Sequence, residues 1–140
     1  MADSKLLLRA AVGDRELLIH AGDVEEVVPL EYLIPFPSDL PGLAGIMAHH
    51  GEPLPVLDWG PYGAGEADCP FVAVLKRRLG VPLTRILEVR DLEGVPEVGL
   101  KRGDPWNPML GHRRRLSGHS QGVLDVEKLL ALLHNRSLRR

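Results

Sequence analysis

The sequence is poor in cysteine, in aromatic residues and in long apolar runs, and it carries almost no excess charge. Its single cysteine, Cys69, excludes an internal disulfide and the multi-cysteine metal sites, and it favours a reducing cytoplasm. The longest apolar runs, Phe71–Leu75 and Leu129–Leu133, are five residues long, so we expect no secretory signal and no membrane insertion. With 17 basic and 19 acidic residues, the net charge of −2 predicts no nucleic-acid partner.

Glycine and proline, by contrast, are abundant, with 15 and 12 of the 140 residues. They are spread along the chain without a period, which predicts many short elements joined by turns and argues against a helical bundle. A chain of this length can bury a core without a structural metal or a disulfide.

Apolar runs separated by turn residues predict a mostly β protein. A first hairpin is expected around Gly13-Asp14, and a second around the turn at 50–53. The expected strands are Lys5–Val12, Arg15–His20, Leu43–His49, Leu54–Trp59, Phe71–Arg77 and Pro82–Val89.

Two helices are also predicted. Asp23 followed by Glu26 matches a capping box, which indicates a short helix over Val24–Val28 that ends at Pro29. Asp125 is expected to cap a second helix over 125–134. Its apolar residues recur at i, i+3, i+4 and i+7, namely Val126, Leu129, Leu130 and Leu133.

The sequence contains an internal repeat of spacing. Gly45, Gly51 and Leu57-Asp58 are six and six residues apart, and Gly111, Gly118 and Leu124-Asp125 are seven and six apart. Each set predicts a strand, a glycine turn and a strand that ends in Leu-Asp. The repeat indicates two similar small β-barrels on either side of the Gly/Pro-rich segment Gly60–Pro70, which we expect to mark the crossing between them. Chance similarity of two hairpins is the competing interpretation.

Three segments resemble the CheW-like domain of bacterial chemotaxis signalling: the central block 45–58, the segment 23–28 and the segment 122–130. The resemblance spans almost the whole chain in family order. It implies two SH3-like β-barrels in tandem with short helices, within one domain over residues 1–140. The subdomains are expected at roughly 15–65 and 70–125, with the N-terminal strand and the helix 125–134 crossing over.

The resemblance also implies a function without catalysis and without a cofactor. CheW-like proteins are adapters that bind the regulatory domain of a CheA-like histidine kinase and the cytoplasmic tips of chemoreceptors. The partner-binding positions that it implies here are Val24, Glu26, Val27, Gly45 and His50. His50 stands where the family carries a turn arginine, so either the partner differs or receptor coupling is altered or lost. A module of twitching motility or of another chemosensory-like system is the alternative.

Two other patterns compete with this interpretation. Gly118–Gly122 reads G-x-S-x-G, which would make Ser120 the nucleophile of a small serine hydrolase, with Asp125 and His134 following in triad order. Those two residues lie at opposite ends of one predicted helix, about 13 Å apart, so a hydrolase is the remote alternative. Adjacent His49 and His50 would point to opposite faces of a strand, so no metal site is predicted.

Overall fold

A computed structural model of the chain describes residues 6–35, 42–64, 67–116 and 118–138. This part of the chain is mostly β, as predicted, with a single α-helix near its end. The strands are β1 (Leu6–Val12), β2 (Arg15–His20), β3 (Val24–Pro29), β4 (Leu43–His49), β5 (Glu52–Leu57), β6 (Phe71–Leu75), β7 (Leu79–Leu83), β8 (Arg85–Asp91), β9 (Glu97–Val98), β10 (Leu110–Leu116) and β11 (His119–Leu124). The helices are the 3-10 turns η2 (Ala21–Asp23), η3 (Gly60–Tyr62) and η4 (Asn107–Met109), and α1 (Val126–Leu138).

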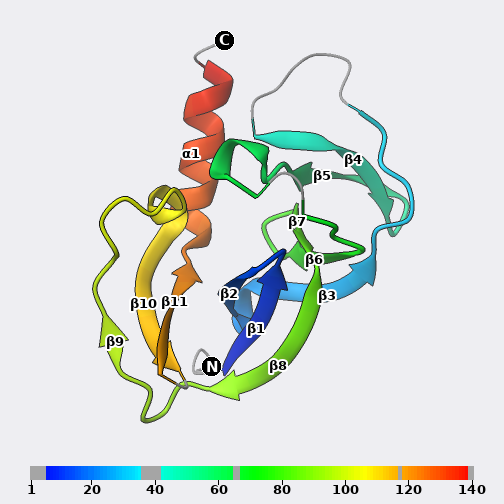
Figure 1. Cartoon of the computed structure of the whole chain (residues 1–140). Coiled ribbons are helices and arrows are strands. Elements are labelled where there is room, and N and C mark those ends of the chain that lie inside the picture. The colour runs from blue at the N-terminus through cyan, green and yellow to red at the C-terminus, as the bar shows by residue number, and fades with distance from the viewer. Residues whose placement is uncertain (1–5, 36–41, 65–66, 117, 139–140) are drawn as a thin grey trace.

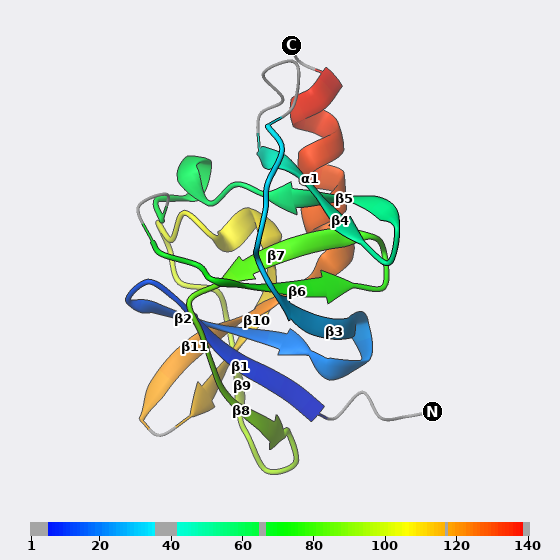
Figure 2. The same cartoon turned by 90° about the vertical axis from the view of Figure 1, so that its right-hand side faces the viewer.

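The strands form two sheets, which Figure 2 shows one above the other. Sheet A has the strand order β8-β1-β2-β11-β10-β9, and sheet B has the order β3-β6-β7-β5-β4. Helix α1 follows the β10–β11 hairpin of sheet A and rises to the level of sheet B (Figure 1). No helix in the described ranges is both long and apolar enough to cross a membrane.

The two segments with the repeated glycine and Leu-Asp spacing also share a structure. The β4–β5 and β10–β11 hairpins take the same place in their sheets, because β5 pairs in parallel with β7 as β11 pairs in parallel with β2. Both hairpins begin and end with a leucine pair, Leu43 with Leu57 and Leu110 with Leu124, and a register shift follows the first pair in each. Their turns contain the left-handed glycines Gly51 (φ 79°) and Gly118 (φ 84°). Chance similarity therefore does not explain the spacing.

The chain passes between the sheets at η2 and at Thr84. Strands β1 and β2 belong to sheet A, β3 to β7 to sheet B, and β8 to β11 return to sheet A. The expectation that Gly60–Pro70 marks the crossing is wrong, because this segment joins β5 to β6 within sheet B and buries Tyr62. The division of strands between the sheets therefore does not coincide with residues 15–65 and 70–125.

The helix predicted over Val24–Val28 is wrong, because these residues form strand β3. Their valines are β-branched, and the open edge of β6 offers them a partner, with Val28 opposite Val72. The capping-box pattern reports only local preference, which the sheet overrides. The C-terminal helix is confirmed and extends to Leu138, with Asp125 Oδ1 accepting a hydrogen bond from the Lys128 N–H at 3.1 Å.

One core lies between the sheets and is shared by them. Trp59 and Trp106 are buried at its centre with their rings stacked, 4.7 Å between centroids. Each indole N–H donates to a backbone oxygen, that of Pro82 for Trp59 and that of Tyr62 for Trp106. The two tryptophans therefore hold the connecting segments on the core, and neither is free to anchor a partner.

Candidate interaction site

The strongest concentration of predicted site residues is around Glu26, where the two edge strands of sheet B, β3 and β4, approach each other. Glu26 Oε2 lies 2.6 Å from His49 Nε2 and 2.6 Å from His50 Nε2. The hydrogen bonds from His49 and then His50 hold the pKa of the Glu26 carboxyl below its ordinary value. The His49 side chain is buried, whereas the His50 side chain is 70% exposed.

The two histidines share one face, contrary to the expectation that they point apart. His50 leaves the strand in a left-handed conformation, with φ 53°, at the start of the turn that continues through Gly51. This backbone places the two imidazole rings 4.1 Å apart between centroids, both directed at Glu26. The period-two rule applies only while both residues remain in the strand.

Arg78 completes this cluster from the turn between β6 and β7. Its Nη1 donates to His49 Nδ1 at 2.9 Å. A guanidinium can only donate, so His49 accepts at Nδ1 and, when neutral, directs its Nε2–H to Glu26. Arg78 and the pairing of His49 were not predictable from the sequence, since neither residue lies near Glu26 in the chain.

Gly45 affects the site because its lack of a side chain lets another backbone segment approach β4. It lies on β4 beside the segment 33–34, where Ile34 makes an antiparallel bridge with Ile46. A Cβ on Gly45 would lie 2.4 Å from the Ile34 carbonyl oxygen and 3.0 Å from Leu33 Cγ. Only glycine therefore allows this segment to pass against β4.

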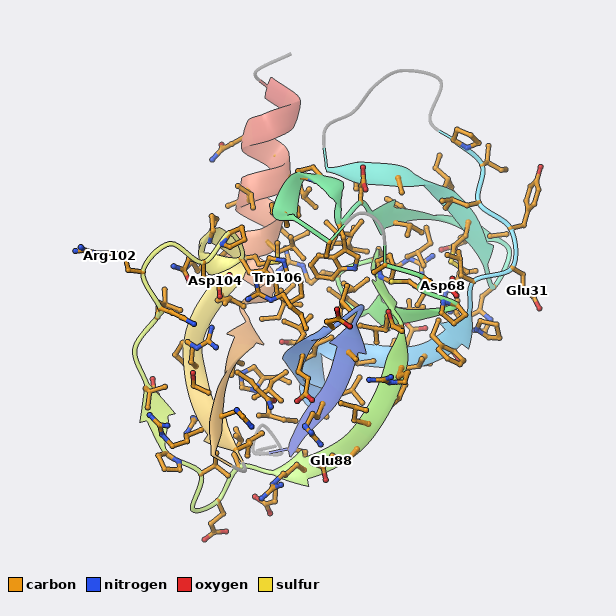
Figure 3. All side chains as sticks on the ribbon, viewed as in Figure 1. Glu31, Asp68, Glu88, Arg102, Asp104 and Trp106 are labelled. Atoms are coloured by element: carbon orange, nitrogen blue, oxygen red, sulfur yellow. The ribbon has the colours of Figure 1, made fainter. Side chains whose placement is uncertain are left out.

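The same segment forms one wall of a groove of about 300 Å³ between β3 and β4. Its lining includes Val28, Tyr32, Ile34, Met47, Ala48 and His50. Tyr32 and Ile34 are 74% and 51% exposed, so the groove presents apolar side chains to solvent. Figure 3 labels Glu31, another lining residue, on the outer side of this region.

The remaining two predicted positions lie apart from the Glu26 cluster. Val24 is half-buried against the shared core, and the exposed Val27 is next to Glu26 in an alternating strand, which places it on the other face of β3. The structure thus brings Glu26 and His50 into contact, places Gly45 under the groove wall, and separates Val24 and Val27 from them.

Ser120 is held by an arginine. Arg113 Nε donates to Ser120 Oγ at 3.0 Å, and Arg113 Nη2 donates to its backbone oxygen. Among the described residues, the hydrogen bonds to this serine side chain include none from a histidine. Asp125 caps α1 and His134 lies on it nine residues later, so the two stay separated along the helix.

Comparison with known proteins rests on structure alone, since no family model and no curated protein matches the sequence. The crystal structure of the scaffolding protein TtCheW from Thermoanaerobacter tengcongensis is similar to this chain, with a TM-score of 0.73. This chain has a CheW-like fold. The similarity covers 87% of this chain and 89% of the TtCheW chain at 15% sequence identity, which confirms the fold expected from the family resemblance.

Proposed function

We propose that the chain is a non-catalytic cytoplasmic adapter of chemotaxis-type signalling that binds the regulatory domain of a CheA-like histidine kinase. The observation that carries this proposal is the exposed apolar groove beside the Glu26–His50 pair on a CheW-like fold. Glu26 and His50 are among the positions that the family resemblance implies for partner binding, and the groove lies beside them.

The surface has the composition of a protein interface. Tyr32 and Ile34 line the groove as exposed apolar side chains, His50 lines it as a polar one, and Glu26 contacts His50. Interfaces take most of their binding energy from a few apolar anchors, while charged and polar neighbours contribute to orientation and specificity. Gly45 supports the anchors by allowing the segment 33–34 to lie against β4.

Receptor coupling is the part of the function that His50 alters. An arginine at this place would project a fixed positive charge, whereas the imidazole of His50 is shorter and is engaged by Glu26. We propose that kinase binding is retained and that coupling to chemoreceptor tips is weak or absent, as in a twitching-motility module. Titration of a receptor-tip fragment into the adapter tests this part separately.

The kinase-binding proposal is tested by Glu26→Lys. Reversing this charge breaks the contact with both imidazoles and places a cation at the rim, so affinity for the kinase regulatory domain should fall about tenfold or more. Isothermal titration calorimetry with the regulatory domain measures the effect. Glu93→Lys, the same change at an exposed residue outside the cluster and the groove, is the matched control.

Circular dichroism of both variants should match that of the unmodified chain. Equal affinities for Glu26→Lys and Glu93→Lys would remove Glu26 from the interface. Failure of the unmodified chain to bind any such regulatory domain would leave the fold without the adapter function.

A further inference from the structure

The Glu26 cluster contains the side chains that a metal ion binds. One ligand atom from each of Glu25, Glu26, His49 and His50 lies within 4.8 Å of the others. The carboxylates come from β3 and the imidazoles from the end of β4, so the group bridges the two edges of sheet B. These edges belong to different segments of the chain, and their approach in the fold creates the cluster.

Two imidazole nitrogens and a carboxylate oxygen are a ligand set that zinc binds in proteins. Magnesium and calcium instead favour sets made of oxygen atoms. Ligand atoms of a tetrahedral zinc ion lie about 3.3 Å apart, given Zn–N and Zn–O bonds of about 2 Å. The two Nε2 atoms lie 2.6 Å from Glu26 Oε2, so an entering ion requires each contact to lengthen by only about 0.7 Å.

The positive φ of His50 belongs to the two-residue hairpin turn His50-Gly51 and also sets the direction of its side chain. A histidine with φ 53° is uncommon, because left-handed conformations disfavour residues with a side chain. That conformation directs His50 at the same oxygen that His49 contacts. The exposure of the His50 side chain gives an ion access from solvent, while buried His49 provides a fixed ligand.

Arg78 competes with an ion for His49. Its hydrogen bond to Nδ1 keeps the proton of neutral His49 on Nε2, the atom that has to bind the metal. Zinc binding therefore requires the proton to move to Nδ1 and Arg78 to withdraw. Glu52 offers the alternative partner, since its Oε1 lies 4.0 Å from Arg78 Nη2.

We propose that Glu26, His49 and His50 form a zinc-binding site, with Glu25 or water as a fourth ligand and with Arg78 opposing occupancy. The site shares Glu26 and His50 with the proposed kinase interface, but it is formed by this chain alone, so it can be tested without a partner. The sequence predicted no metal site at His49 and His50. The structure differs because the left-handed turn brings these two adjacent side chains together.

The test is calorimetric titration of zinc into the full chain after treatment with a chelator, with cobalt(II) absorption as a second readout of coordination. One equivalent should bind saturably, and magnesium should not replace it. His50→Asn suits the left-handed backbone, and Glu26→Gln preserves size; each should weaken zinc binding about 100-fold or more. Arg78→Gly, which also suits its φ of 61°, should tighten binding several-fold.

His119→Ala is the control, because this exposed histidine lies on β11 outside the cluster. Absence of saturable binding, or equal losses for His50→Asn, Glu26→Gln and His119→Ala, would overturn the site. Unchanged or weaker binding by Arg78→Gly would overturn the competition by Arg78. All measurements are made without a kinase, so their failure is distinct from failure of the adapter proposal.

Discussion

Asp104 and Glu26 are each held between two basic side chains, on opposite sides of the molecule. Asp104 Oδ2 accepts hydrogen bonds from Arg15 at 2.6 Å and Arg113 at 3.1 Å, and its side chain is 5% exposed. Glu26 accepts from two imidazoles, and its side chain is 36% exposed. Figure 3 shows Asp104 beside Trp106 near one end of β10, far from Glu31 at the groove.

The difference lies in burial and in the kind of base. Arginine keeps its charge at every physiological pH, and Arg15 also packs on the Trp106 ring at 3.9 Å, so the Asp104 cluster is permanently paired inside the structure. Histidine can be neutral, can change its hydrogen-bonding atoms and can bind metals. We infer that the Asp104 cluster serves stability and the Glu26 cluster serves binding.

The largest expected effect is that of Asp104→Asn on stability. The variant leaves Arg15 and the buried Arg113 without a carboxylate, so the free energy of unfolding should fall by about 2 kcal/mol or more. Urea denaturation at neutral pH measures this loss, and kinase affinity of the folded variant should be unchanged. A loss as small as that of an exposed carboxylate would remove the proposed difference between the clusters.

The dependence of stability on pH is a second test of the Asp104 cluster. Burial raises the pKa of Asp104, but the hydrogen bonds from Arg15 and the Trp106 N–H and the charges of both arginines outweigh it and lower the pKa. Its contribution to stability is therefore complete above the unfolded pKa of about 4 and is lost as pH falls through the lower folded pKa. Below about pH 4, Asp104→Asn should lose stability less steeply than the unmodified chain.

Gly45→Ala should have an intermediate effect, confined to the binding side. The added Cβ meets the Ile34 carbonyl oxygen, so the segment 33–34 has to move, with a loss of about 1–3 kcal/mol in unfolding free energy and weaker kinase binding. Gly99→Ala is the matched control, since nothing lies within 4 Å of its added Cβ. Thermal denaturation and calorimetry of both variants measure the two effects. Equal behaviour of the pair would mean that the groove wall adapts freely.

The sequence predicted the features that depend on local spacing. The glycine and Leu-Asp pattern identified two equivalent hairpins, and Asp125 identified the start of α1. Features that depend on partners far along the chain were not predictable in the same way. The capping-box pattern at Asp23 carries no information about the open edge of β6, and Arg15 and Asp104 are 89 residues apart.

In the candidate site, too, single residues could be predicted from the sequence but their long-range contacts could not. Family resemblance singled out Glu26 and His50, but their contact arises from the meeting of the two edges of sheet B. Arg113 lies in the basic run Arg113–Arg115, yet it is buried and paired with Asp104. A charge pattern alone does not distinguish a solvated arginine from one that a distant carboxylate draws inward.

Glu26→Gln should have the smallest effect on stability. Glu26 is partly exposed and its neighbours can remain neutral, so loss of its charge leaves no buried cation unpaired, unlike Asp104→Asn. The shift in Tm should therefore be clearly smaller than that of Asp104→Asn, while kinase affinity should fall more. Asp104→Asn should thus have the larger effect on stability, and Glu26→Gln should have the larger effect on kinase affinity. If Glu26→Gln were the more destabilising, the Glu26 cluster would be a structural pair like that of Asp104, and the effect of Glu26→Lys on binding would have to be attributed to misfolding.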